Sequence, residues 1–76
     1  MTYKELQELT EGRSLPLFGK NEDGENVIIE HRTEKYTHDL DSIERVYFKI
    51  STAQHNGWMK IVHIYDDGSV EGFYRK

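Results

Sequence analysis

The chain has 76 residues, no cysteine and a formal net charge of −4 at neutral pH. This length suits a single domain, residues 1–76, with a small core and little room for a deep substrate cleft. The lack of cysteine excludes disulfides and thiolate metal ligands, and the acidic balance argues against a general nucleic-acid-binding protein.

The charge is unevenly distributed along the chain. Residues 1–44 hold 5 Lys/Arg and 11 Asp/Glu, a net charge of −6, whereas residues 45–76 hold 5 Lys/Arg and 3 Asp/Glu, a net charge of +2. The basic last third leaves a local nucleic-acid site as an alternative. No apolar run approaches the ~18 residues of a membrane span, so we expect a soluble, cytoplasmic protein without a membrane partner.

The first twelve residues, MTYKELQELTEG, predict a short helix. Thr2 and Glu5 have the spacing of a capping box, and Gly12 is placed to end the helix. A helix this short is marginal alone, so we expect its apolar stripe to pack on the rest of the domain. The stripe consists of Tyr3, Leu6 and Leu9.

Residues 14–32, SLPLFGKNEDGENVIIEHR, predict a β-hairpin. Pro16 marks an edge strand or a strand start, and Asp23-Gly24 is a turn signal. The next segment, residues 33–42, lacks a clear hydrophobic period and is predicted as a loop. Asp41 or Ser42 is placed to cap a single helical turn there.

Three further strands are predicted at residues 43–53, 58–65 and 70–75, joined by turns at Asn56-Gly57 and Asp67-Gly68. The predicted fold class is therefore α+β. One short N-terminal helix is followed by about five antiparallel strands, a hairpin plus a three-stranded meander. These strands form a small curled sheet or a partly closed barrel.

Two-residue turns in the meander predict which side chains share a face, although a three-residue first turn would flip one strand. One face then carries Phe48, Ile50, Ile61, His63, Tyr65, Val70 and Tyr74. The other face carries Tyr47, Lys49, Trp58, Lys60, Val62, Ile64, Phe73 and Arg75.

The second face mixes aromatic and cationic side chains and has two interpretations. In the first, the helix or the first hairpin covers it, and the cations lay their stems on the apolar patch. In the second, part of it is an exposed surface for protein or single-stranded nucleic acid. The first is favoured because a chain this short needs most of its apolar groups for a core.

Few residues form a pattern with known chemistry. The loop at residues 21–26 lacks the aspartate that begins an EF-hand, and residues 39–42 have a D-x-D spacing that fits a solvated or capping loop better than a magnesium site. The four histidines show no metal-ligand spacing. His63 with Tyr65 or Tyr74 is a conceivable acid–base pair, but we expect no enzyme, no cofactor and no metal.

Three functional hypotheses follow. The first is a small non-enzymatic protein-binding module: an adaptor, an inhibitor or an antagonist from a mobile element. The second is nucleic-acid binding through the aromatic and basic face of the meander, and the third is homo-oligomerisation through an exposed edge strand. The candidate binding residues are Tyr47, Lys49, Trp58, Lys60, Phe73 and Arg75, together with the acidic residues Glu22, Asp23, Glu25, Asp39 and Asp41.

Overall fold

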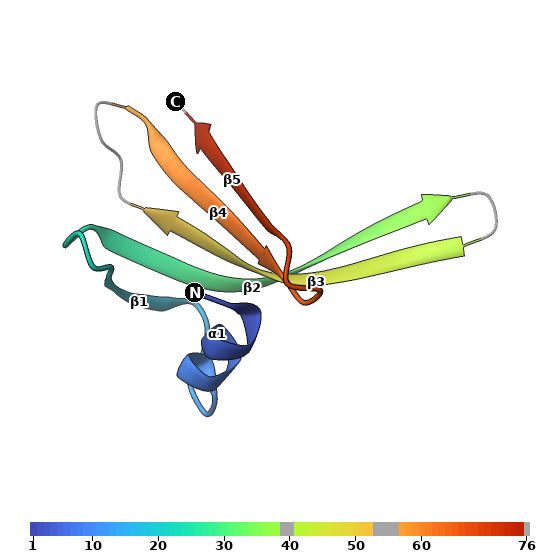
Figure 1. Cartoon of the computed structure of the whole chain (residues 1–76), viewed down its shortest axis with the longest axis horizontal. Helices are drawn as coiled ribbons and strands as arrows, with labels where there is room; N and C mark the ends of the chain where they lie inside the picture. Colours follow the sequence, from blue (N-terminus) through green and yellow to red (C-terminus); the bar gives the residue numbers. More distant parts are fainter. Residues whose placement is uncertain (39–40, 53–56, 76) are drawn as a thin grey trace.

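The computed structural model describes residues 1–38, 41–52 and 57–75, without the side chains of residues 37–38 and 41–43. The described chain forms one helix and five strands: α1 (Tyr3–Thr10), β1 (Leu17–Lys20), β2 (Asn26–His38), β3 (Asp41–Thr52), β4 (Met59–Tyr65) and β5 (Val70–Arg75). The strands pair antiparallel in chain order, β1-β2-β3-β4-β5 (Figure 1). The predicted α+β fold is confirmed, and the sheet is open, with β1 and β5 at its two edges.

The N-terminal helix forms as its capping residues predict. Thr2 Oγ1 accepts a hydrogen bond from Glu5 N–H at 3.2 Å, which satisfies one of the free donors of the first turn. Gly12, with φ +72°, follows the end of the helix. Leu6 and Thr10 are buried against the sheet, whereas Leu9 is 40% exposed, so the inward stripe differs from the predicted one at its last position.

The predicted loop at residues 33–42 is wrong where the structure describes it, because β2 continues to His38 and β3 begins at Asp41. No helical turn forms at Asp41 or Ser42. Opposite charges face each other across this ribbon in the pairs Glu34↔Arg45 and Lys35↔Glu44. Such cross-strand pairs stabilise strands that bury little apolar surface, and they leave no hydrophobic period in the sequence.

The meander has a different register from the predicted one. Phe48 pairs with Ile64 and Ile61 pairs with Phe73, so each hairpin is shifted by one residue. The second turn gives the reason: Gly68 N–H donates to Tyr65 O at 3.0 Å, and Gly68 has φ +89°. This is a three-residue loop that ends in a left-handed glycine, which reverses the side-chain facing expected for two residues. The predicted Asn56-Gly57 turn lies partly outside the described residues.

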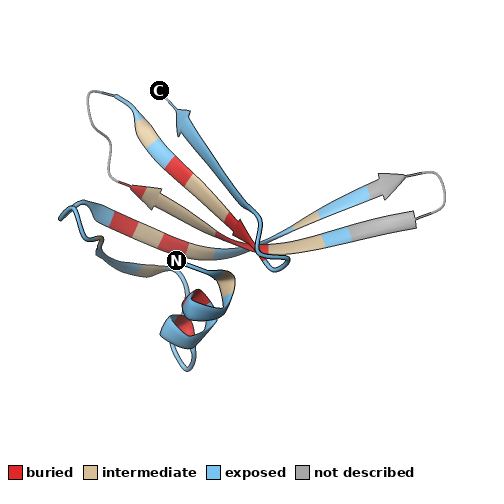
Figure 2. Ribbon diagram, in the orientation of Figure 1, coloured by how far each residue is buried: buried red, intermediate tan, exposed pale blue. Residues whose placement is uncertain are grey.

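The core lies between α1 and one face of the sheet, called here the helix-covered face. Fully buried Leu6 contacts Ile29, Phe48 and Ile64 from β2, β3 and β4. Figure 2 shows the buried positions on these strands and on the inner side of α1. Partly buried side chains pack around this cluster: Tyr3, Leu17, Ile50 and Val62. The sheet face opposite the helix is therefore left for other contacts.

Candidate binding surface

The observed register brings aromatic and cationic side chains together on the sheet face opposite α1. Tyr47 pairs with Tyr65, Lys49 with His63, and His63 with Glu71, so these side chains share one face. We call this surface the aromatic–basic face. It comprises Arg45, Tyr47, Lys49, His63, Tyr65, Glu71, Phe73 and Arg75.

The aromatic rings of this face form one continuous cluster. The ring centroid of His63 lies 4.7 Å from that of Tyr47 and 5.1 Å from that of Phe73, and it meets Tyr65 edge-on at 6.2 Å. The guanidinium of Arg45 lies 3.8 Å above the centre of the Tyr65 ring, which is cation–π geometry. The cluster therefore spans β3, β4 and β5 and ends beside a cation.

The aromatic side chains of the cluster differ in how far they are exposed to solvent. Tyr47 is 7% exposed and Tyr65 is 3% exposed, although no helix covers this face. Phe73 is 42% exposed, and Lys49 is only partly buried. The two tyrosines therefore act as a packed floor, and the groups available to a partner are the Phe73 ring and the surrounding charges.

The titratable rings of this cluster are uncharged at neutral pH, and burial favours that form further. Burial raises the pKa of Tyr65 to about 12, helped by the hydrogen bond from the Tyr65 hydroxyl to Glu71 Oε2 at 3.0 Å. Burial also raises the pKa of Tyr47 and lowers the pKa of His63, whose Nδ1 is buried without a hydrogen-bond partner in the described structure. These groups suit apolar and stacking contacts better than proton transfer.

The candidate residues of the meander are divided between the two sides of the sheet. Tyr47 and Lys49 from β3 lie on the same face as Phe73 and Arg75 from β5, as predicted. Lys60 lies on the helix-covered side, where it is opposite Tyr74. Trp58 precedes β4 and is 48% exposed.

The acidic candidates do not form one patch. Exposed Glu22, Asp23 and Glu25 lie in the turn between β1 and β2, where Asn21 Oδ1 accepts hydrogen bonds from the backbone N–H groups of Asp23 and Glu25. Asp41 begins β3 at the opposite end of the β2–β3 ribbon, so about 40 Å of strand separates the two groups. Asp39 lies outside the described residues.

Sequence reasoning missed four members of the aromatic–basic face. His63 and Tyr65 join it because β4 is reversed relative to the expected facing, whereas Arg45 and Glu71 lie on the expected sides of β3 and β5. The signal that places His63 and Tyr65 is Asp66-Asp67-Gly68 read as a three-residue loop with glycine in its last position. Tyr74, the alternative partner of His63, lies on the opposite face from it.

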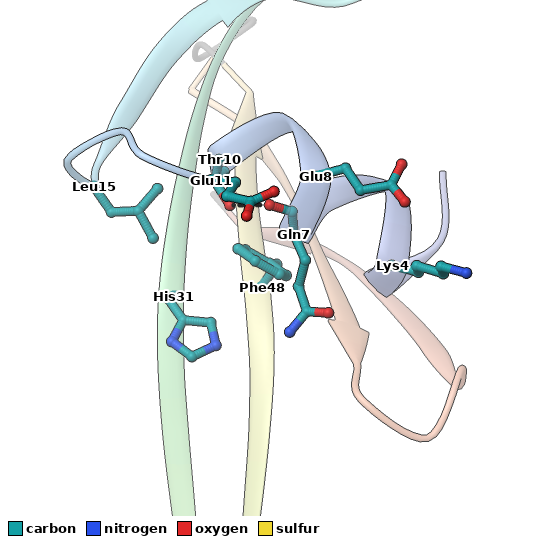
Figure 3. A pocket seen from close by; sticks show the side chains of 8 residues that line it. All are labelled: Lys4, Gln7, Glu8, Thr10, Glu11, Leu15, His31 and Phe48. Carbon is teal, nitrogen blue, oxygen red and sulfur yellow. Dashed lines mark hydrogen bonds between the residues drawn. The ribbon is translucent and has the colours of Figure 1, made fainter.

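Apart from the aromatic–basic face, a hollow with a volume of about 530 Å³ lies between α1 and the sheet. Figure 3 shows Gln7 and Glu11 near Phe48, with Leu15 and His31 beside them, whereas Lys4 and Glu8 point away from these residues. The Tyr3 hydroxyl lies 3.1 Å from His31 Nε2, within hydrogen-bonding distance. The polar side chains lie along its rim, so it has the character of an open, solvated groove.

The described residues contain no group of three or more His, Asp or Glu side chains placed to hold a metal ion. Among them, no helix is long and apolar enough to cross a membrane. Comparison of the chain with protein-family models, with curated protein sequences and with solved structures gave no match. The class that fold and site define is a small α+β domain with one uncovered aromatic–basic sheet face.

Proposed function

We propose that this protein is a small non-enzymatic binding module that recognises a protein partner through its aromatic–basic face. The observation that carries the proposal is a sheet face without a covering helix, on which a packed aromatic floor supports half-exposed Phe73. Aromatic and arginine side chains on a well-packed base dominate the energetics of protein interfaces. An adaptor or an inhibitor is the role that suits such a small packed surface.

A protein partner is favoured over single-stranded nucleic acid. Stacking of bases requires open ring faces, whereas Tyr47 and Tyr65 are buried below the surface. The charges around His63 are mixed, with Glu34 and Glu71 beside Lys49 and Arg75, so phosphates would not meet a uniformly positive surface here. The absence of cysteine from the sequence fits action in the reducing cytoplasm.

The test is capture of partners from a lysate of the source cells with tagged wild type and variants, with and without nuclease. Phe73→Ala and Lys49→Glu change the aromatic–basic face and should each reduce recovery of the partner at least about tenfold. The matched controls are Tyr74→Ala and Lys60→Glu on the opposite face, which should retain it.

Thermal midpoints of all four variants are measured in parallel, so that loss of folding is separated from loss of binding. A partner that disappears after nuclease treatment would transfer the proposal to nucleic acid. Equal recovery by the face variants and their controls would show that the aromatic–basic face is not the binding surface.

A further inference from the structure

The strand β5 is an edge of the sheet that is open along its whole length. All six of its residues, Val70–Arg75, are exposed, as Figure 2 shows. The other edge, β1, has four residues and follows Pro16, two features that discourage the addition of another strand. In contrast, β5 contains no proline and exposes Val70, Phe73 and Tyr74. An edge of this kind is a template for pairing with another chain.

The backbone of β5 shows which groups are offered at this edge. Tyr65 N–H donates to Ser69 O at 2.9 Å, so the odd-numbered residues of β4 turn their backbone groups toward β5. Their partners on β5, Glu71, Phe73 and Arg75, turn their own backbone groups toward β4. The alternating residues Val70, Gly72 and Tyr74 therefore direct N–H and C=O outward. At Gly72 an added Cβ would meet nothing within 4 Å, so no described side chain covers the sheet face at the centre of β5.

The occupant that this edge fits best is a second copy of the same chain. Directly opposed residues of an antiparallel pair point to the same face of the sheet. A two-fold axis normal to the sheet must therefore lie midway between one residue of β5 and the same residue of the second copy. With the axis at Phe73, Glu71 of each chain lies opposite Arg75 of the other, which makes two pairs of opposite charge. With the axis at Gly72, Glu71 lies opposite Phe73 and no such pairs form.

We propose that β5 pairs antiparallel with β5 of a second copy, with Phe73 at the two-fold axis and Glu71 opposite Arg75 of the second copy. The hydrogen bond from the Tyr65 hydroxyl holds the Glu71 carboxylate on this face at 3.0 Å. The two sheets become continuous, and the two aromatic–basic faces join across the axis. Each copy thereby adds Phe73, Glu71 and Arg75 to the binding surface of the other.

The first experiment is sedimentation equilibrium of the wild-type protein over a wide concentration range. A reversible monomer–dimer equilibrium is expected, and a monomer at the highest soluble concentration would overturn the proposal. Gly72→Pro removes an outward N–H without removing a hydrogen bond to β4, and should abolish the dimer. Gly72→Ala keeps that N–H and should retain it, so equal behaviour of the two variants would also overturn the proposal.

The second experiment tests the register and does not depend on the folding of the proline variant. Glu71→Arg and Arg75→Glu each convert two attractive pairs into two repulsive ones, and each should raise the dissociation constant about tenfold or more. An equimolar mixture of the two variants restores complementary pairs and should dimerise as a heterodimer. Failure of the mixture to associate more tightly than either variant alone would overturn the Glu71–Arg75 register.

The dimer and the proposed protein partner are tested independently. Lys49→Glu acts on partner recovery, and Lys49 has no place in the β5 pairing. Gly72→Pro acts on dimerisation and leaves the aromatic side chains unchanged. A dimer without a partner, or a partner bound by a monomer, would therefore contradict only one of the two proposals.

Discussion

His63 occupies the centre of the aromatic–basic face, yet it contributes no charge there at neutral pH. Its imidazole lies among Tyr47, Tyr65 and Phe73, and its Nδ1 is buried. Burial lowers the pKa of His63 from its ordinary value of 6.5. Nearby charges act in both directions, with Glu34 and Glu71 raising the pKa and Lys49 and Arg75 lowering it, and burial has the largest effect. The folded state thus favours the neutral ring.

This pKa shift predicts how stability depends on pH. The unfolded state takes up a proton near pH 6.5, whereas the folded state resists protonation until the pH is lower. The stabilisation is therefore fully present above about pH 6.5 and is lost as the pH falls toward the folded pKa. The thermal midpoint should drop as the pH falls below about 6.5, and His63→Gln should flatten that drop. His31→Gln controls for the loss of an imidazole elsewhere, and an equal effect of both variants would contradict the assignment to His63.

At the scale of elements, the turn between β4 and β5 determines which side chains share a face. Its geometry is fixed by Gly68, with φ +89°, and by Asp67 Oδ1, which accepts a hydrogen bond from Ser69 N–H at 2.8 Å. The Asp67 carboxylate also pairs with Arg45 at 3.1 Å, which ties the turn to β3. A left-handed backbone favours glycine because a Cβ would crowd the following carbonyl.

We therefore predict that Gly68→Ala lowers the free energy of unfolding by about 1–2 kcal/mol. Gly19→Ala is the matched control, since an added Cβ there also meets nothing within 4 Å but the residue lies in β1 without a positive φ. Its effect should stay within about 0.5 kcal/mol. Urea unfolding followed by circular dichroism measures both values. Similar losses for the two variants would mean that the turn tolerates a different backbone geometry.

The same turn explains how far the candidate site could be predicted from sequence. The helix, the first hairpin and the strands of the meander follow from local signals: a capping box, alternation and glycine turns. Register does not, because one residue more or less in a turn reverses a whole strand and leaves the alternation pattern unchanged. Each hairpin of the meander is shifted by one residue, and two shifts restore the expected facing of β5 relative to β3. Tyr47 and Phe73 therefore lie on one face, as predicted. Only one shift separates β4 from β3, so the facing of β4 is reversed. Lys60 therefore lies on the helix-covered face and Tyr65 on the aromatic–basic face, the opposite of the prediction.

At the scale of the whole molecule, the protein is more extended than its length requires. Its radius of gyration is 13.7 Å and its longest dimension is 44 Å, whereas a compact chain of this size has a radius near ~11 Å. The difference comes from the part of the β2–β3 ribbon beyond β1 and β4, which projects to the right in Figure 1. We call this part the outer arm, residues 33–38 and 41–46. It was missed in the sequence because its stability rests on pairing between strands and not on a buried face.

The outer arm predicts an uneven distribution of stability along single strands. Two-stranded ribbons are marginal in water unless a third strand or a helix packs on them. In β3 the residues near Phe48 lie between β2 and β4, whereas the backbone of Glu44 and Arg45 pairs with β2 alone. The amides of Glu34, Tyr36 and Arg45, which face the partner strand of the ribbon, should therefore exchange with solvent through local opening, at free energies well below that of global unfolding.

Native-state hydrogen exchange measures this difference residue by residue. The amides of Ile29, Phe48 and Ile61 serve as the reference, because these residues are buried in the sheet and should exchange near the global limit. A small addition of denaturant should leave exchange of the arm amides nearly unchanged and accelerate that of the reference amides, since local opening exposes little surface. Equal protection of the two sets would instead show that the arm unfolds together with the body, so that the cross-strand charge pairs Glu34↔Arg45 and Lys35↔Glu44 stabilise it as firmly as burial stabilises the core.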